Sequence, residues 1–290
     1  MFLAYLIYIL ILAAIGIILA VSLQLTVGFT GLLNLGHLAF YAIGAYTSAL
    51  LALAGYPFWF CILTAGVLAM FFGFLISLPI NKIKKDYLAL ATMGFSFVVY
   101  AVLLNWTDLT NGPLGLAGIP RPQLFGFDFS QNSNFLLLVA IIALASYLII
   151  KLITISPFGR VLESIRDNEL AAKILGKNTF KMKMCAMGAS AFFAGVAGSL
   201  YAYYITYLDP SSADIMQLIP FLAIVIIGGL GSLEGTVVAA IVLTFLPEPL
   251  RFIGFPSSII GAARQVIYAL FLLLILIFKP KGFYGKVKLE

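Results

Sequence analysis

The sequence predicts an all-α integral membrane protein, a polytopic bundle of about eight to ten transmembrane helices, some of them broken. The 290-residue chain is 63% hydrophobic and only 10% charged, with a mean hydropathy of +1.12. Soluble domains carry about 25% charged residues, so the solvent for this surface is lipid. Apolar runs of spanning length recur along the whole chain. They lack the two-residue alternation of barrel strands, so the spans are expected to be helices.

A helix needs roughly 20 residues to cross the hydrocarbon core of a bilayer. Apolar runs near this length lie at 2–27, 36–55, 58–80, 87–106, 133–153, 184–207, 215–229, 234–250 and 263–278. The span count stays open, because 215–229 is short and 2–55 holds either two spans or a broken third. The first run lacks a basic flank and a clear cleavage site, so we interpret it as a retained span.

Most of the 17 basic residues, all but Arg121, Arg251 and Arg264, fall into three regions that set the expected orientation. They are Lys82 to Lys85, the stretch from Lys151 to Lys183, and the tail from Lys279 onward. Nine alternating spans put all three regions on one side, which is expected to be the cytoplasm. The C-terminus is then cytoplasmic as well. Membrane orientation accounts for the net charge of +6 without a nucleic-acid partner.

One long loop, residues 107–132, is expected on the outer side. Glycine and proline dominate it, which is typical of turn-rich surface structure. Further along the chain, residues 185–200 carry small side chains at four-residue spacing. Such rows let helices approach closely in lipid. We therefore expect Ala191, Gly195 and Ser199 to pack helices together or to line a subunit interface.

Two glycine-rich stretches interrupt the apolar runs. They are "TVGFTGLLNLGHLAFYAIGAY" (26–46) and "GGLGSLEGT" (228–236). Broken helices in transporters place backbone groups beside a substrate. A polar turn at the membrane surface has a similar sequence, and for 26–46 that alternative stays open. The only histidine, His37, has no Cys, Asp or Glu company, so we expect a hydrogen-bonded structural role and no metal site.

Several function classes lack their residues in this sequence. No G-x-x-x-x-G-K-[ST] motif occurs, so the chain is not expected to bind ATP through a P-loop. No group of catalytic or metal-ligating residues lies near a span, which disfavours an intramembrane enzyme. Ionisable residues lie almost entirely in loops and at span ends, which disfavours a proton-coupled carrier. Sodium coupling through backbone carbonyls stays open. Cys61 and Cys185 are expected to be buried free thiols.

The segment "SPFGRVLESIRDNELAAKILGKN" (156–178) is typical of a water-soluble protein. Ser156 is a suitable N-cap with Pro157 at the first helical position. Asn168 can cap a second helix, and Gly176 can end it in the left-handed conformation. We therefore predict two short helices beneath the membrane.

Both predicted helices are amphipathic, and Glu169 and Lys173 form an i,i+4 pair on the second. The apolar faces comprise Val161, Leu162 and Ile165 on the first helix, and Leu170, Ile174 and Leu175 on the second. Two capped amphipathic turns favour a docking element for a cytoplasmic partner over a plain connector.

"LAAKILG" (170–176) resembles the EAA-x-x-x-G coupling loop of ABC importer permeases, with Leu170 where that motif has Glu. The full segment, with "TGLLNLGHLAFYAIGAYTSALLA", "NGPLGLAGIP" and "IIGGLGSLEGT", is similar to the LivM-type permeases of branched-chain amino acid importers. The similarity covers roughly residues 25–250, and the "GPLGLAGI" loop favours the LivM type over the LivH type. One departure lies in "LEGT" at 233–236, where many members read Gly-Pro after Gly-Ser-x-x.

The resemblance implies one permease domain over 1–290, with the outer loop 107–132 and a coupling segment at 155–183. It implies a LivH-like second permease subunit, two cytoplasmic ATPase subunits that bind the ATP, and an extracytoplasmic protein that delivers leucine, isoleucine or valine. The chain is then a multi-pass transporter subunit of the cell membrane that binds no cofactor and no nucleic acid itself. A heterodimer is the usual arrangement in this family, although the sequence does not exclude a homodimer.

The resemblance also assigns candidate site residues. Those expected to couple to the ATPases are Arg160, Glu163, Arg166, Glu169, Leu170, Ala171, Ala172 and Gly176. We expect the apolar face to lie in an ATPase groove, with Arg160, Arg166 and Glu169 at its rim.

The substrates are zwitterions with apolar side chains, so uncharged groups are expected to line the path. The candidates are Asn34, His37, Tyr41, Thr92 and Ser96, each with structural packing as its alternative. Three other functions stay open: a urea or short-amide permease of the same superfamily, a sodium-coupled carrier, and a structural or channel-like membrane protein.

Overall fold

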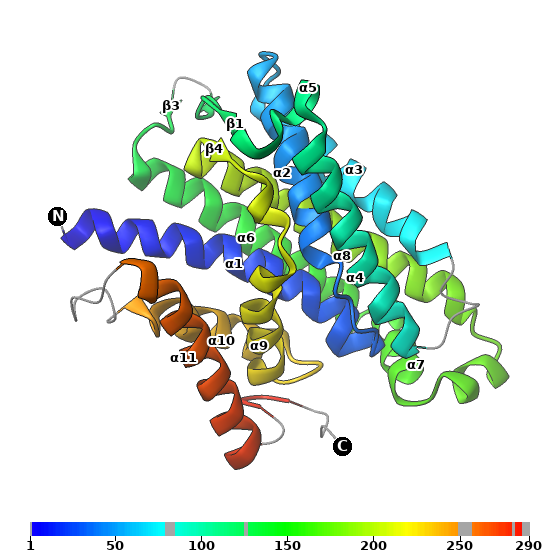
Figure 1. The fold of residues 1–290 in the computed structure, drawn as a ribbon. Coiled ribbons are helices and arrows are strands. Elements are labelled where there is room, and N and C mark those ends of the chain that lie inside the picture. Colours follow the sequence, from blue (N-terminus) through cyan, green and yellow to red (C-terminus); the bar gives the residue numbers. More distant parts are fainter. Residues whose placement is uncertain (1, 79–84, 125–126, 249–256, 280–281, 286–290) are drawn as a thin grey trace.

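A computed structural model describes residues 2–78, 85–124, 127–248, 257–279 and 282–285, and within them the chain is almost entirely helical (Figure 1). The predicted fold class, a helical polytopic membrane protein with broken helices, is confirmed. Among the described residues, five helices are long and apolar enough to cross a membrane, and four shorter apolar helices accompany them. The long ones are Leu3–Thr30, Phe58–Ser77, Tyr87–Asn105, Asn132–Ile155 and Thr179–Ile205.

The elements follow the order of the predicted runs, with small shifts in their limits. The larger helices are α1 (Phe2–Thr30), α2 (His37–Leu53), α3 (Phe58–Ser77), α4 (Lys85–Asn105), α6 (Asn132–Ile155), α7 (Pro157–Ile174), α8 (Thr179–Ile205), α9 (Ile219–Gly228), α10 (Leu233–Phe245) and α11 (Ser257–Phe278). The short elements are α5 (Thr107–Thr110), η2 (Gly112–Leu114), β1 (Leu116–Ala117), β2 (Gln123–Leu124), β3 (Phe127–Asp128), β4 (Tyr207–Leu208), η3 (Pro210–Ala213) and η4 (Ile215–Leu218).

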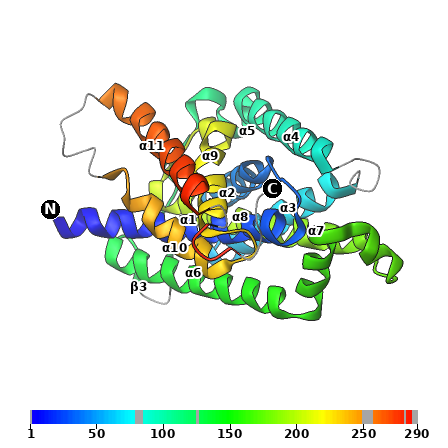
Figure 2. The ribbon, with the colours of Figure 1, turned by 90° about the horizontal axis from the view of Figure 1, so that it is seen from below.

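Helix α1 runs through the middle of the molecule, and its two ends define the two ends of the fold (Figure 1, Figure 2). Near its start, the Tyr5 hydroxyl donates to the carboxylate of Glu248, which follows α10. Near its end, the Gly28 carbonyl accepts a hydrogen bond from Arg166 of α7. We call the end of the molecule near Arg166 the α7 end, and the end near Tyr5 the far end.

The C-terminal segment returns to the α7 end. Phe283 N donates to Ile227 O at 2.8 Å, and Tyr284 N donates to Gly228 O at 3.2 Å. The stretch from Lys151 to Lys183 and the start of the basic tail therefore lie at the same end, as the charge pattern predicts. Lys82 and Lys84, in the basic region just before α4, lie outside the described residues.

The predicted outer loop covers the far end. It contains α5, η2 and three short strands, and β1 pairs antiparallel with β4 in the register Leu116↔Leu208. Arg121 fastens the loop, because its guanidinium donates to Ser130 O and to Asn132 Oδ1 at 2.6 and 2.8 Å. The same cation lies 5.7 Å from the centroid of the Tyr204 ring.

Helix α8 packs closely against α2 and α3 through its small residues. A Cβ built on Gly195 would lie 2.7 Å from Ala69 Cβ of α3, and one built on Gly198 would overlap the Tyr41 carbonyl oxygen of α2. Ala191 and Ser199 are fully buried within this chain. The predicted row of small residues thus lets three helices approach one another with little side-chain volume between them.

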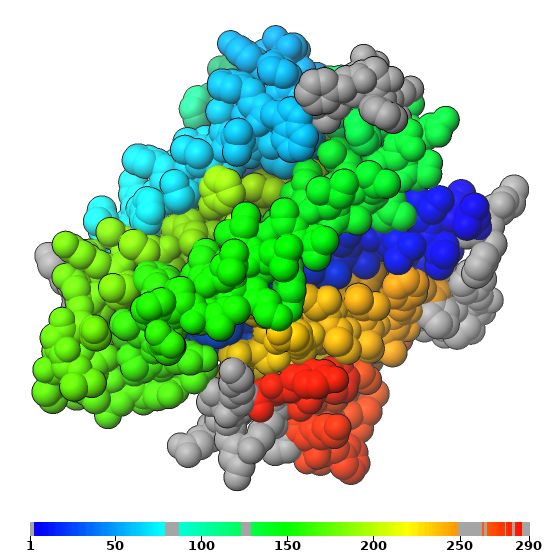
Figure 3. Space-filling model, turned by 180° about the vertical axis from the view of Figure 1, so that it is seen from behind, coloured from blue at the N-terminus to red at the C-terminus, as the bar shows by residue number. Residues whose placement is uncertain are grey.

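Figure 3 shows the opposite face, where α1 reaches the surface between α6 and α10. A mostly apolar groove of about 470 Å³ lies there, with Ala14, Ala143 and Val237 among its lining residues. The two predicted buried cysteines differ. Cys61 is buried, but Cys185 is exposed near the start of α8, so the prediction is wrong for Cys185.

Candidate functional site

Residues 156–178, the α7 segment, form two short helices as predicted. They are joined at Asn168, whose φ of −154° and ψ of 100° are extended. Asn168 Oδ1 accepts from Ala171 N at 3.0 Å, so this residue caps the second helix. Gly176 follows that helix with φ +76°. Ser156 occupies the N-cap position, but its hydroxyl donates backward to Ile153 O at 2.7 Å and makes no cap bond.

The two halves of the α7 segment bury different amounts of their apolar surface. On the first half, Leu162 and Ile165 are fully buried against the bundle. On the second half, Leu170, Ile174 and Leu175 have relative exposures of 71%, 85% and 74%. No other described element covers these three side chains, and they form an apolar surface that we call the outer face of α7.

Glu169 points inward toward α8. Its Oε1 atom lies 2.7 Å from Lys183 Nζ and 3.1 Å from Lys173 Nζ, and the Thr179 hydroxyl donates to it at 3.1 Å. The predicted pair with Lys173 exists, but the buried Lys183 is the shorter contact. Partial burial raises the pKa of Glu169, but the hydrogen bonds from the two lysines outweigh it and hold this pKa below its ordinary value.

Arg166 also turns inward, which corrects the expectation that it lies at the rim of a docking face. Its side chain is only 12% exposed. One terminal nitrogen donates to Gly28 O at 2.9 Å, while Nε donates to Asp167 Oδ1 at 2.9 Å. The physical reason is that the last carbonyls of α1 lack partners within their own helix, and Arg166 supplies a charged donor.

Residues 31–36, the first break, lie between α1 and α2 and lack regular structure. Gly31 has φ +67° and directs the chain back along α4. Leu35 N donates to the Thr92 hydroxyl at 3.0 Å, and the Ser96 hydroxyl donates to Leu35 O at 3.2 Å. Two hydroxyls of α4 thus satisfy backbone groups that no helix satisfies, as irregular backbone inside a membrane protein requires.

Helix α2 begins at the end of this break, well inside the bundle. His37 Nε2 lies 3.1 Å from Leu19 O and 3.0 Å from Ser22 Oγ. A carbonyl oxygen only accepts, so we assign the proton to Nε2. His37 Nδ1 and Asn34 Nδ2 are fully buried and have no hydrogen-bond partner among the described residues. The sequence question about residues 2–55 is therefore answered by one long helix, a break, and a short helix.

Residues 229–232, the second break, join α9 to α10 beside the first. Gly229 and Gly231 have φ of +100° and +79°. Gln24 of α1 donates to Gly229 O at 2.8 Å. A Cβ on Gly231 would lie 2.9 Å from a terminal nitrogen of Arg166. Arg166 therefore lies at a junction of α7, the end of α1 and the second break.

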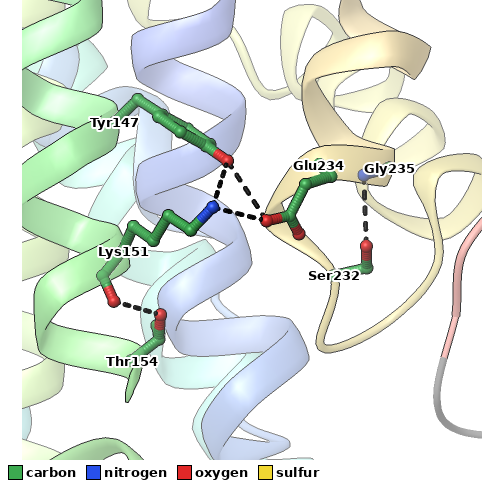
Figure 4. A network of polar contacts seen from close by, with 6 residues as sticks. All are labelled: Tyr147, Lys151, Thr154, Ser232, Glu234 and Gly235. Atoms are coloured by element: carbon green, nitrogen blue, oxygen red, sulfur yellow. Dashed lines mark hydrogen bonds and ion pairs between the residues drawn. The ribbon is translucent and has the colours of Figure 1, made fainter. Parts of the chain in front are cut away.

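A polar network links α6 to the start of α10 at this end (Figure 4). Lys151 Nζ donates to Glu234 Oε1 at 2.9 Å and to the Tyr147 hydroxyl at 3.4 Å. The Ser232 hydroxyl caps α10 by accepting from Gly235 N at 3.1 Å. Glu234 precedes Gly235 and Thr236, the pair at which many family members read Gly-Pro. Sequence reasoning missed the ion pair between Glu234 and Lys151. The available signal was the opposite charge of Lys151, near the end of the span that forms α6.

Two cavities lie at opposite ends of the molecule. The inner recess, about 310 Å³, lies at the α7 end, and Arg160, Glu163 and Glu234 are among its lining residues. The outer cavity, about 290 Å³, lies toward the far end, and Tyr41 and Asp209 are among its lining residues. Of the five candidate path residues, Tyr41 lines this cavity. The other four are buried at the first break and are at most 1% exposed.

The described residues hold no cluster of three or more His, Cys, Asp or Glu side chains that suits a metal ion. The site therefore consists of the α7 segment, the two breaks it contacts, and the outer cavity beyond them. This arrangement can transmit a displacement of α7 to irregular backbone inside the bundle, and it can hold a small molecule on the far side of that backbone.

Comparison with known proteins identifies close relatives. The sequence model of the family described as "Branched-chain amino acid transport system / permease component" matches residues 5–278. The high-affinity branched-chain amino acid transport system permease protein LivM of Escherichia coli K12 is 37% identical, over 93% of this chain and 68% of the relative. The LivM protein of Salmonella typhimurium is 36% identical, over 92% of this chain and 67% of the relative.

More distant similarity extends to a second type of permease. The LivH permease protein of Escherichia coli K12 is 24% identical, over 94% of this chain and 92% of the relative. No solved structure matches the chain.

Proposed function

The chain belongs to the branched-chain amino acid transport system permease family as a LivM-type member, and on that premise we propose that it forms part of the membrane path of an ATP-driven importer of leucine, isoleucine and valine. The relatives named for this transport cover more than nine-tenths of the chain. A permease subunit moves its substrate through conformational change in the membrane domain, and such a subunit is not itself an enzyme.

The observation that carries the mechanism is the two-sided construction of the α7 segment. Its outer face exposes Leu170, Ile174 and Leu175, while Arg166 and Glu169 hold its inner side to α1 and α8. An exposed apolar surface at the end of an amphipathic helix favours docking to another protein. The proposed partner is a cytoplasmic ATPase subunit, one of two, which binds and hydrolyses the ATP.

The proposed dock is mainly apolar. Leu170 stands where the family motif has Glu, and desolvated anchors contribute more to such an interface than charges at its edge. Ala171 and Gly176 lie beside these anchors and leave room for the partner's groove. Arg160 and Glu163 line the inner recess, so they face the junction between the dock and the second break.

The proposed orientation places the α7 end in the cytoplasm, with the C-terminus. The lysines and arginines of the α7 segment and the start of the basic tail support it, since cytoplasmic loops carry an excess of such residues. The far end, with its outer loop, then faces an extracytoplasmic binding protein that delivers the amino acid. A LivH-like second permease subunit completes the path. The chain needs no cofactor of its own in this proposal.

The test is uptake of labelled leucine into proteoliposomes that contain this chain, the second permease subunit and both ATPase subunits. We expect uptake that requires internal ATP and the external binding protein. Uptake that persists without the ATPases would favour a sodium-coupled carrier. Uptake of urea in preference to leucine would favour an amide permease.

A substitution on the dock tests the role of the outer face. Ala171→Glu places a carboxylate among the apolar anchors, so we expect the ATPases to be lost during co-purification, and uptake with them. Lys181→Ala, an exposed change at the start of α8, is the matched control and should leave both unchanged. Normal assembly and uptake in Ala171→Glu would contradict the assignment of the dock.

A further inference from the structure

The outer cavity has an apolar depth and a polar rim. Its depth is lined by Leu12, Ile15 and Leu19 of α1, Leu38 at the start of α2, and Phe221 of α9. Leu19 and Leu38 adjoin the hydrogen bond of His37, so the cavity ends at the first break. Asp209, Ser212 and Gln217 lie on its rim, in the segment that follows β4 at the far end.

The charges on the cavity wall have one sign. Asp209 and Glu248 are among the lining residues, and none of the described lining residues is a lysine, an arginine or the histidine. Glu248 accepts from the Tyr5 hydroxyl, and Asp209 Oδ1 accepts from Ser211 N at 2.7 Å. This acidic rim attracts a cation. It repels an anion that carries no positive charge of its own. It departs from the expectation that uncharged groups alone line the path.

Two tyrosines stand between the rim and the apolar depth. The rings of Tyr41 and Tyr201 lie 5.8 Å apart and both line the cavity. A phenol supplies a hydroxyl donor for a carboxylate and a ring face for an ammonium group. The wall therefore carries a site for a positive charge, donors for a negative one, and an apolar surface below them.

The volume matches one small ligand. A volume of about 290 Å³ is room enough for one aliphatic amino acid. A site on a transport path must also release its ligand, so the affinity must be weak.

We propose that the outer cavity is a low-affinity site for an aliphatic L-amino acid, with the ammonium group at Asp209, the carboxylate at the hydroxyls of Tyr41 and Tyr201, and the side chain against Leu12, Ile15 and Leu38. The proposal rests on the proposed function and locates one substrate site within this chain. The cavity wall thus recognises a ligand that carries both a positive and a negative charge and an apolar side chain.

Ligand-detected NMR tests the recognition directly. The complete complex in nanodiscs, without the binding protein, is mixed with L-leucine, and saturation transfer from protein to ligand is measured. We expect the strongest transfer to the methyl protons, because they lie deepest. Leucinamide, which keeps the ammonium group, should compete, while 4-methylpentanoate, which lacks it, should not. Asp209→Asn should weaken leucine binding about tenfold or more, since hydrogen bonds to charged groups are worth about 1.5–3 kcal/mol.

A cavity-filling pair gives a second, independent test. Gly16 lines the cavity, and a Cβ built there meets only the Phe221 ring, at 3.7 Å, so Gly16→Leu should fill the space without disturbing a backbone. Gly94 of α4 has nothing within 4 Å of its Cβ position, so Gly94→Leu is the control. We expect Gly16→Leu to abolish saturation transfer and ATP-driven uptake while the ATPases still co-purify, and Gly94→Leu to retain all three.

The outcomes separate the two proposals. Leucine uptake that persists in both Asp209→Asn and Gly16→Leu overturns the cavity site and leaves the importer standing. Competition by 4-methylpentanoate as strong as by leucinamide also overturns it, because the site would then recognise only an apolar tail. Absence of leucine uptake by the wild-type complex overturns the proposed function, and the cavity site with it.

Discussion

At the scale of single residues, the contacts within a few positions of one another were predictable, and the distant ones were not. The pair Glu169 and Lys173 follows from helix periodicity, and the cap at Asn168 follows from residue type. The shorter contact of Glu169 is with Lys183 on the next helix, and no spacing rule joins residues across a turn. Arg166 was expected at a rim for the same reason, since its acceptor Gly28 is far away in the sequence.

The Glu169 cluster predicts a dependence of stability on pH. Because the folded-state pKa of Glu169 is lowered, its ion pairs stabilise the fold above the unfolded-state pKa and are lost as pH falls through the folded value. Glu169→Gln should therefore lower the melting temperature of the complex at neutral pH. The difference from wild type should shrink as the pH falls from about 4.3, the ordinary pKa of a glutamate, through the lower folded-state pKa, below which the carboxyl is protonated in both states.

Melting curves at several pH values check this, with Glu163→Gln as the matched change on the same helix. Glu163 forms no ion pair within the part of the chain that the structure describes. A Glu169→Gln deficit that stays constant from neutral to acidic pH would show that the ion pairs are not its cause.

At the scale of elements, the hydrophobic runs predicted the helices and their order, but not the internal breaks. The run near residues 2–55 was ambiguous because Thr30, Asn34 and Gly36 fit a surface turn as well as a break. The structure places the break beside α4, where Thr92 and Ser96 hold its backbone. The candidate path residues were selected as uncharged polar groups in spans. Four of the five meet at this break, because buried irregular backbone needs those same polar groups.

Close packing of α8 on α2 gives a prediction at this scale. A Cβ at Gly198 would overlap the carbonyl oxygen of Tyr41, a backbone atom that cannot rotate away. Gly198→Ala should force the two helices apart and cost about 1–3 kcal/mol, which is typical of overpacking. Gly94→Ala, a helical glycine with open space around it, should be neutral or slightly stabilising.

The measurement is the melting temperature of both variants in the same detergent or nanodisc. Equal melting temperatures for Gly198→Ala and Gly94→Ala would show that α2 and α8 are farther apart than the structure places them.

At the scale of the whole molecule, the chain is a bundle whose two ends differ in charge and in surface character. The α7 end carries basic residues and an unpaired apolar surface, and the far end carries a cavity with an acidic rim. Composition and hydropathy predicted the membrane and the order of the helical runs, and the charge pattern predicted that the α7 segment and the start of the basic tail lie at one end. They did not predict the cavity, because its lining comes from residues scattered between Leu12 and Tyr268. Only the folded arrangement brings these together.

We propose that a displacement of the α7 segment is transmitted to the two breaks through Arg166. The guanidinium uses separate nitrogens for Gly28 O and Asp167, and the single ammonium of lysine cannot reproduce that geometry. Arg166→Lys keeps the charge and should keep the ATPases bound. It should weaken the contact between the α7 segment and the two breaks. Lys181→Arg, an exposed change at the start of α8 that also keeps the charge, is the control.

The most direct test is the number of leucine molecules imported per ATP hydrolysed, measured in proteoliposomes for the wild type and both variants. We expect a lower ratio in Arg166→Lys, with ATP hydrolysis and assembly maintained, because lysine cannot make both hydrogen bonds of the guanidinium. Lys181→Arg should keep the wild-type ratio. An unchanged ratio in Arg166→Lys, with the complex intact, would contradict transmission through Arg166.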